Sequence, residues 1–427
     1  MRAEHIYSLY EDIREKDYVI ASYYMELFPR EDPYEKAKKF AVGQTIGTWV
    51  PVPGITEKMR EKYMGKVIQI YDIPPADLSV QMEKEETWPY IIQIAYPIEH
   101  FQKQFPLLLT TLLGNDASTS AQAKLVDLQL PKKLLQEFSG PRFGIQGLRS
   151  LCAVESRPML LNMIKPCTGF TPDVGAKIFY ETALGGVDFI KDDELLGNPY
   201  YCPLEERIRA YEKASEAAYE RSGKKTIYIP NITDNAGRLL DNGRRAASAG
   251  ARMVMVNFAA VGYSMLQALT EALEIPVFGH YAGSGPLYEG RDTGISSPLA
   301  VGKLPRLLGA DGVMINTPYG GYPLKRQKYL RTHHELSLPL GHIKPALTTV
   351  GGGVNPGFAG KLVKDLGRDI MLAPGGAVQG HPMGAAAGVR AMLQAIEAQE
   401  KGISIDEAAK EHEELKKAVE LWGYLPV

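Results

Sequence analysis

The sequence predicts an α/β protein in which an amino-terminal ferredoxin-like α+β domain, residues 1–138, precedes a carboxy-terminal (β/α)₈ TIM barrel, residues 139–427. Three observations support this fold class. The chain has 427 residues, enough for one large barrel and a smaller domain. Strand and helix patterns alternate in a ferredoxin-like order in the first third. After that, short apolar runs followed by helical segments recur eight times, as parallel barrel strands require.

The first domain is predicted from the order strand, helix, strand, strand, helix, strand. The strand segments are rich in β-branched and aromatic residues, and the helical ones carry charged or apolar helix formers. The expected strands are residues 18–27, 65–73, 90–98 and 124–130, and the expected helices are residues 33–40 and 105–113.

The barrel is predicted from apolar runs that end in polar or glycine residues. Near-continuous apolar character is typical of parallel strands that are buried on both faces. The eight runs are residues 158–165, 187–194, 226–231, 252–257, 276–280, 312–316, 343–350 and 369–373. Helices are expected at residues 203–220, 237–249 and 304–308 between the strands, and at 383–401 and 405–422 as closing helices.

Composition excludes several function classes. Lys plus Arg number 48 and Asp plus Glu 50, so no net charge draws the chain to nucleic acid or acidic membranes. The three cysteines lack metal-ligand spacing and fit a reduced, cytoplasmic setting. Residues 1–16 are charged, so no signal peptide is expected, and no apolar run is long enough to cross a bilayer. His333 and His334 lie in a charged helical stretch and are expected at the surface.

Residues 185–194, GGVDFIKDDE, begin apolar and end in four ionisable residues. In a strand, Lys191 and Asp193 point the same way, and Glu194 lies at the end, where the chain can turn it to the same place. Converging charges at a buried strand end are costly unless they pair or bind something. One interpretation is a lysine neutralised between two carboxylates. The other is a Mg²⁺ site, which the lysine joins only after CO₂ converts its amine to a carbamate.

Other predicted strands also end in polar or glycine residues, and these ends meet on the rim that carries barrel active sites. Lys165 ends the first strand and is either a charge paired with Glu194 or a proton donor and acceptor with a lowered pKa. His280 ends the fifth strand, where a structural hydrogen bond, a substrate contact and proton transfer are all open. The seventh and eighth strands run into glycines 351–353 and 375–376.

These glycine clusters predict a phosphate site. Glycine lets backbone N–H groups approach a phosphate closely, and barrels often hold phosphate after strands seven and eight. A simple chain turn is the alternative. A cation, a base and an anchored phosphate together suit removal of a proton next to a carbonyl, because the cation stabilises the enediolate and the phosphate fixes the reacting carbons.

The 185–194 stretch closely resembles the metal-site motif of ribulose bisphosphate carboxylase/oxygenase (RuBisCO). Further similar motifs follow in the same order, so that the resemblance covers nearly the whole chain. They are Gly47-Thr48-Trp49, GPRFGIQ at residues 140–146, Ile164-Lys165-Pro166 and GHPMG at residues 380–384.

The resemblance implies a carbamate on Lys191 and Mg²⁺ held by that carbamate, Asp193 and Glu194. It implies that Lys165 transfers protons. It also implies a homodimer in which the partner's amino-terminal domain brings Thr48, Trp49 and Asn115 to the site. The residues implied for phosphate binding are Thr48, Trp49, Gly352, Gly353, Gly375 and Gly376.

The departures from RuBisCO are equally informative. Where the carboxylase has a second lysine after the first, this chain has Cys167, and where it has an arginine after the strand-five histidine, this chain has Tyr281. Met314 replaces a histidine in strand six, and Gly351 replaces a serine before the strand-seven glycines. Gly43 replaces a glutamate before Gly-Thr-Trp. The strand-six loop also lacks the mobile lysine. The lost groups include most of the second phosphate site, so CO₂ fixation on a bisphosphate is not expected.

The pattern is most similar to RuBisCO-like (form IV) proteins, and among them to the 2,3-diketo-5-methylthiopentyl-1-phosphate enolases of methionine salvage. This similarity implies Mg²⁺-dependent enolisation of a mono-phosphorylated diketone. The TIGTW loop, the Pro-Tyr-Gly loop at residues 318–320 and the LWG tail at residues 421–423 carry it.

Asn115 stands where that enolase group has a lysine base. An asparagine cannot take a proton, which leaves the Lys191 carbamate as the base and the substrate open. One alternative is a decarboxylase or transcarboxylase acting on a phosphorylated branched keto-acid sugar. A non-catalytic binding protein is the other, although it would have no need of the complete set Lys165, Lys191, Asp193 and Glu194.

Overall fold

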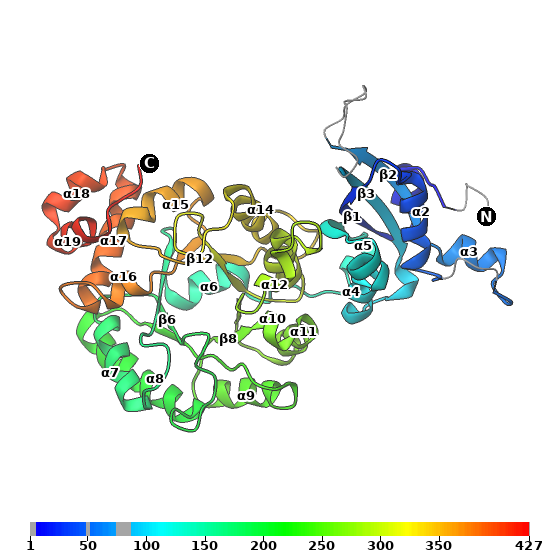
Figure 1. Ribbon diagram of the computed structural model, residues 1–427. Coiled ribbons are helices and arrows are strands. Elements are labelled where there is room, and N and C mark those ends of the chain that lie inside the picture. Colours follow the sequence, from blue (N-terminus) through cyan, green and yellow to red (C-terminus); the bar gives the residue numbers. More distant parts are fainter. Residues whose placement is uncertain (1–5, 48–51, 74–86, 427) are drawn as a thin grey trace. The chain divides into compact units, whose positions relative to one another are not determined.

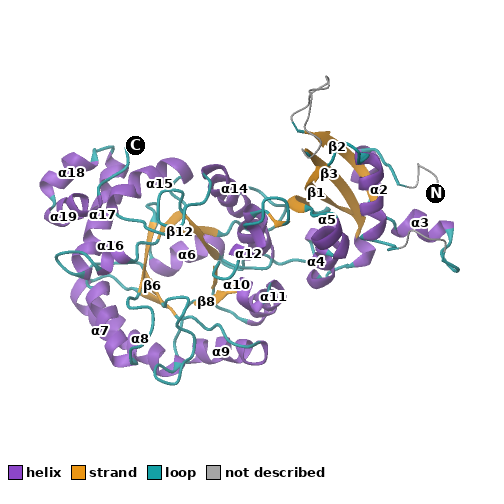
Figure 2. Cartoon of the chain, viewed as in Figure 1, coloured by secondary structure: helices purple, strands orange, loops and turns teal. Residues whose placement is uncertain are grey.

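The computed structural model describes residues 6–47, 52–73 and 87–426. These residues form two compact units. The first contains the chain up to Phe138 together with Ser284–Ala300, and the second contains Ser139–Gly283 and Val301–Val427. Figure 1 follows the chain through both, and Figure 2 shows helices around strands in each unit.

The first unit is built on a mixed sheet with the strand order β10-β4-β1-β3-β2. Its main strands are β1 (Tyr18–Leu27), β2 (Lys66–Asp72), β3 (Trp88–Pro97) and β4 (Lys124–Gln129). β1 pairs antiparallel with both β3 and β4, which is the ferredoxin-like arrangement that the sequence predicts. The helices are α1 (Tyr10–Arg14), α2 (Pro33–Gly43), α3 (Glu57–Tyr63), α4 (Phe105–Leu113) and α5 (Lys132–Leu135).

Residues 284–300 leave the barrel sequence after its fifth strand and join the first unit. They form α12 (Gly285–Tyr288) and β10 (Gly294–Ile295). β10 pairs parallel with β4, and the Lys124 ammonium donates to the carbonyl of Tyr288 at 2.7 Å. The sheet of this unit therefore gains an edge strand from a distant part of the chain.

The second unit is a barrel of eight parallel strands in the order β7-β6-β5-β13-β12-β11-β9-β8. The strands are β5 (Met159–Met163), β6 (Phe189–Lys191), β7 (Ile227–Ile229), β8 (Val254–Asn257), β9 (Val277–His280), β11 (Gly312–Asn316), β12 (Leu347–Gly351) and β13 (Ile370–Leu372). A single bridge between Asn231 and Met255 joins β7 to β8 and nearly closes the barrel. The TIM-barrel prediction is confirmed.

Alternate residues of each strand fill the barrel interior, as the two-residue period of a strand requires. In β5 these are Met159, Leu161 and Met163, and the same buried cluster includes Ile145 and Leu148 of α6. α6 (Gly144–Cys152) therefore packs against the barrel core.

Helices surround the barrel strands (Figure 2). They are α7 (Pro172–Ala183), α8 (Leu204–Ser222), α9 (Ala236–Ser248), α10 (Phe258–Val261), α11 (Tyr263–Ala272), α13 (Leu304–Leu307), α14 (Arg326–Ser337), α15 (Ala359–Leu366), α16 (Gly376–Gln379) and α17 (Ala385–Lys401). The carboxy-terminal helices α18 (Ile405–Glu411) and α19 (Glu413–Trp422) follow. Among residues 6–47, 52–73 and 87–426, no helix combines the length and the apolar character needed to cross a membrane.

Three local predictions require correction. The strand expected from residue 343 begins only at Leu347, after a turn that contains the Leu340–Ile343 bridge. The helical stretch 405–422 is divided at His412, whose backbone is extended. His333 is buried rather than exposed, because α14 turns it toward Thr348 on β12.

Candidate active site

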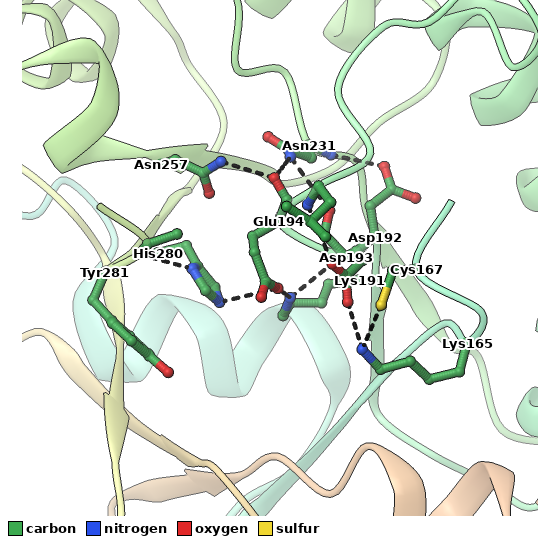
Figure 3. A network of polar contacts seen from close by, with 12 residues as sticks. Lys165, Cys167, Lys191, Asp192, Asp193, Glu194, Asn231, Asn257, His280 and Tyr281 are labelled. Atoms are coloured by element: carbon green, nitrogen blue, oxygen red, sulfur yellow. Dashed lines mark hydrogen bonds and ion pairs between the residues drawn. The ribbon is translucent and has the colours of Figure 1, made fainter. Parts of the chain in front are cut away.

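The carboxyl ends of three barrel strands bring the predicted charged residues into one network (Figure 3). β5 leads into Lys165, β6 ends at Lys191 and continues into Asp193 and Glu194, and β9 ends at His280. This is the face on which barrels carry their active sites.

The Lys191 side chain is completely buried at the centre of this network. Its ammonium donates to the Asp192 backbone carbonyl at 2.9 Å and lies 3.8 Å from a Glu194 carboxylate oxygen. Burial lowers the pKa of Lys191, against the opposing charges of Glu194, Asp193 and Asp192.

Lys165 pairs with Asp193 and not with Glu194. Its ammonium lies 2.6 Å from Asp193 Oδ2 and 3.1 Å from the Cys167 sulfur. Burial lowers the pKa of Lys165, but the hydrogen bonds to Asp193 and Cys167 outweigh it, so the pKa is raised. The lowered pKa expected for Lys165 beside other cations in a metal-bearing rim stays a prediction, because the raised pKa reflects the protein side chains alone.

Asp192 faces away from this network, as strand alternation demands. Its carboxylate lies 3.0 Å from Arg207 of α8, accepts from the Tyr228 hydroxyl at 2.7 Å and accepts from the Asn231 backbone N–H at 2.8 Å. Asp192 and Arg207 are both fully buried. Asp192 thus fixes the turn from which Asp193 and Glu194 project.

Two asparagines also hold this turn, and no sequence pattern predicted a role for either. The side-chain amides of Asn231 and Asn257 donate to the Glu194 backbone carbonyl at 3.1 and 2.9 Å. Asn257 ends β8, and its buried Oδ1 has no hydrogen-bond partner within the described residues. Only its position at a strand end could have indicated it.

His280 is buried, and its Nε2 lies 3.6 Å from Glu194 Oε2. The Ala282 backbone N–H donates to Nδ1 at 3.2 Å, which places the proton of a neutral imidazole on Nε2. Burial, followed by the charges of Lys191 and Lys165, lowers the pKa of His280 well below its usual value.

A chain of contacts leads from His280 to the glycines after β12. The Tyr281 ring stacks on His280 at 5.0 Å, and its hydroxyl donates to Asn316 Oδ1 at 2.5 Å. A Cβ on Gly352 would lie 3.0 Å from the same Asn316 oxygen, and Gly352 has a φ of +82° that favours glycine. Gly353 has a φ of +90° and lies against Gly320 of the β11–α14 loop.

The second glycine pair follows β13. A Cβ on Gly375 would collide with the Met163 sulfur and would lie 3.9 Å from Lys165 Cε. Gly376 begins α16. Gly375, the first glycine after β13, therefore lies beside Lys165.

Three predicted site residues belong to the first unit. Asn115 is exposed and follows α4, and its backbone carbonyl accepts from the Thr119 hydroxyl. Thr48 and Trp49 lie outside the described residues.

The donor set limits which cation could bind. Within the part of the chain that the structure describes, no three histidine, cysteine, aspartate or glutamate side chains form a metal-binding group. Asp193 and Glu194 supply two carboxylates, and the unmodified amine of Lys191 between them is not a ligand for a hard cation. Oxygen ligands suit Mg²⁺, and the set fits that ion once the lysine amine carries CO₂.

Comparison with known proteins decides the family. The N-terminal domain of the ribulose bisphosphate carboxylase large chain matches residues 8–134, and the catalytic domain matches residues 144–422. The chain belongs to the ribulose bisphosphate carboxylase large-chain family.

The relatives of this RuBisCO-family chain include RuBisCO-like proteins. A ribulose bisphosphate carboxylase-like protein from Archaeoglobus fulgidus is 40% identical over 97% of this chain and 95% of its own length. The 2,3-diketo-5-methylthiopentyl-1-phosphate enolase of Geobacillus kaustophilus is 35% identical over 96% of this chain and 99% of its own length. The crystal structure of a RuBisCO-like protein (MtnW) from Alicyclobacillus acidocaldarius has a TM-score of 0.87 and 35% identity, and covers 95% of this chain and 100% of that one. The chain is thus a RuBisCO-like member of an enzyme family.

Proposed function

We propose that this RuBisCO-like protein catalyses the Mg²⁺-dependent enolisation of a mono-phosphorylated diketone, of the type 2,3-diketo-5-methylthiopentyl 1-phosphate. The observation that carries the proposal is the charged network at the barrel mouth, in which Lys191 and Asp193 are buried and Glu194 and Lys165 are partly exposed. A binding protein would gain nothing from burying an amine among carboxylates, because such burial costs free energy.

The proposed cofactor is Mg²⁺, held by Asp193, Glu194 and a carbamate formed from Lys191 and CO₂. When bound, this ion would polarise the substrate carbonyl and stabilise an enolate. Lys165, whose ammonium lies 2.6 Å from Asp193, would give or take a proton beside it. The neutral imidazole of His280 offers an N–H on the same face.

One phosphate is supported rather than two. The Gly352–Gly353 and Gly375–Gly376 segments would anchor a phosphate through backbone N–H groups, with Thr48 and Trp49 as further proposed contacts. The positions of the lost second phosphate site are apolar or neutral: a Cβ on Gly351 would lie 2.5 Å from the Met314 methyl, and Tyr281 is bonded to Asn316. A second phosphate would find no cation at these positions.

The proposed assembly is a homodimer. By the family resemblance, the partner's amino-terminal domain would contribute Thr48, Trp49 and Asn115 to each site. No nucleic-acid or membrane partner is proposed, because the net charge is near zero.

Asn115 favours a second candidate. It replaces the lysine base of the enolase group, and so supports a decarboxylase or transcarboxylase acting on a phosphorylated branched keto-acid sugar. The Archaeoglobus relative, named only as carboxylase-like, is compatible with either reaction.

The test is an absorbance assay for the enol. The wild-type protein, Lys165→Ala and the exposed-lysine control Lys213→Ala are each incubated with Mg²⁺, bicarbonate and the diketo phosphate. We expect enol formation by wild type and control, and a loss of about 10²–10⁴-fold in Lys165→Ala, the usual contribution of a proton-transfer group. Release of CO₂ from a phosphorylated keto acid without enolase activity would favour the second candidate. Tight binding of these ligands with no turnover would show a binding protein.

A further inference from the structure

A buried amide behind the barrel strands holds the glycine turn that follows β13. Asn162 lies on β5 and faces outward, because the alternate residues of this strand fill the barrel interior. It is completely buried, and its side-chain Nδ2 donates to the Pro374 carbonyl at 2.7 Å and to the Gly375 carbonyl at 3.4 Å. The pairing of Leu372 with Leu160 brings the turn level with Asn162.

The orientation of this amide is fixed by a chain of hydrogen bonds. The Pro374 carbonyl can only accept, so Asn162 must turn its Nδ2 toward it and its Oδ1 away from it. Oδ1 accepts from Gln379 Nε2 at 2.6 Å, and the same Nε2 donates to the Thr182 hydroxyl oxygen at 2.9 Å. The Thr182 hydroxyl donates in turn to the Ile178 carbonyl at 2.8 Å. Because a backbone carbonyl ends the chain on each side, the amide has one orientation.

This orientation determines where the glycine N–H groups point. The C=O and N–H of a planar trans peptide point in opposite directions. Since the Pro374 carbonyl points out of the barrel to Asn162, the Gly375 N–H points into the barrel mouth, where a Cβ on Gly375 would lie 3.9 Å from Lys165 Cε. The weaker bond to the Gly375 carbonyl turns the Gly376 N–H the same way. Within the described residues, neither N–H group donates to a backbone carbonyl, so both are available to a ligand.

We propose that Asn162 is a positioning residue that aims the N–H groups of Gly375 and Gly376 at the substrate phosphate. It acts from behind the strand, through the peptide that follows Pro374, and makes no contact with the substrate itself. An aliphatic side chain at residue 162 would leave that peptide free to turn its carbonyl toward the mouth, where the carbonyl oxygen would repel a phosphate. This inference rests on the phosphate site of the proposed function.

A simpler role would be that Asn162 and Gln379 only satisfy each other inside the protein. The two roles separate when both amides are replaced by leucine. A single replacement leaves the other buried amide without its partner, which is costly, whereas replacing both partners by apolar groups is nearly neutral for stability. The double replacement therefore restores the folded state but still leaves the Pro374 carbonyl unheld.

The experiment measures the dissociation constant of inorganic phosphate by phosphorus-31 NMR titration, the thermal midpoint, and KM and kcat for the diketo phosphate. Asn162→Leu and Asn162→Leu/Gln379→Leu are compared with wild type and with Gln394→Leu, a control that removes an amide bonded to Glu414 in the same unit. We expect Asn162→Leu to lower the midpoint and the double variant to regain it. In both, phosphate should bind about 10- to 100-fold more weakly, the worth of a hydrogen bond to a charged group. KM should rise by a similar factor with kcat little changed, and the control should keep the wild-type phosphate affinity.

A second measurement uses the wild-type protein alone. Inorganic phosphate should slow hydrogen exchange, followed by mass spectrometry, in the peptide that contains Gly375 and Gly376. No slowing there, wild-type phosphate affinity in the folded double variant, or an equal loss of affinity in Gln394→Leu would overturn the inference and leave enol turnover by wild type untouched. Phosphate binding that depends on Asn162 in a protein that forms no enol would instead overturn the enolase proposal alone.

Discussion

Lys191, Asp192 and Asp193 are consecutive residues with different surroundings, because successive side chains of a strand point to opposite faces. Lys191 and Asp193 face the barrel mouth, whereas Asp192 binds Arg207 and Tyr228 behind the strand. Asp192, which points away from the barrel mouth, therefore fixes the positions of Lys191 and Asp193, which face it.

This arrangement predicts that Asp192→Ala destabilises the protein strongly. The substitution leaves the fully buried Arg207 guanidinium without its charge partner, which costs about 3–5 kcal/mol of unfolding free energy. Calorimetry would measure the loss, with Asp173→Ala, an exposed acid on α7, as the control. A loss no greater than that of the control would contradict the structural role.

The sequence predicted the charged members of the site better than their partners. Period-two alternation and strand-end position were enough to predict which charged side chains meet at the barrel mouth: Lys191, Asp193, Glu194, Lys165 and His280. Their roles stay predictions. Lys165 pairs with Asp193 rather than with Glu194 because of the turn after β6, and no local sequence pattern specifies that turn. Asn257 was missed because an uncharged amide at a strand end carries little signal.

At the scale of single elements, α14 is joined to β12 through a buried histidine. His333 Nδ1 lies 2.9 Å from the Thr348 hydroxyl. Burial, and to a lesser extent His334, lowers the pKa of His333 from 6.5 to about 4. The folded protein therefore holds this imidazole neutral under conditions in which the unfolded chain would protonate it.

This shift predicts acid destabilisation through His333. Between pH 6.5 and about 4 the unfolded state binds the proton and the folded state does not, so stability falls as the pH falls and levels off near pH 4. The effect is at most about 3 kcal/mol. His333→Asn keeps a hydrogen-bonding group and should make the thermal midpoint depend less on pH between pH 6.5 and 4. An unchanged slope would show that other groups cause the dependence.

Helices and strands were predicted well where the apolar period was regular. β1 and α4 were placed at their observed bounds, and all eight barrel strands were found. Errors fell at element ends: the chain turns before Leu347, and the backbone at His412 separates α18 from α19. The first break is marked in the sequence by Gly341, which has a φ of +56°, and by Pro345. No glycine or proline marks the second break.

At the scale of the whole molecule, neither of the two units is one continuous segment of the chain. Residues 284–300 belong to the first unit, where Arg291 pairs with Glu26 at 2.6 Å and β10 pairs with β4. A two-residue strand has no readable period, and its partner lies far away in the sequence. Sequence patterns therefore gave no sign of this connection.

This connection predicts a selective effect of Gly294→Ala. Gly294 has a φ of +86°, and a Cβ there would collide with the Leu287 carbonyl, so alanine should cost about 1–3 kcal/mol. Hydrogen exchange followed by mass spectrometry should show faster exchange in β4 and β1, with β5 and β12 unchanged. Gly237→Ala on α9, where a Cβ meets nothing within 4 Å, is the control. Faster exchange confined to the barrel strands would contradict this grouping.

The carbamate proposed on the Lys191 amine at the barrel mouth can be measured directly. Wild type and Lys191→Arg are incubated with ¹³C-bicarbonate and Mg²⁺, and carbon-13 NMR is recorded with and without chelator. We expect a carbamate resonance in wild type that weakens when Mg²⁺ is removed and is absent from Lys191→Arg, together with loss of enol formation in that variant. An enzymatically active wild type without that resonance, or an equal resonance in Lys191→Arg, would contradict this expectation.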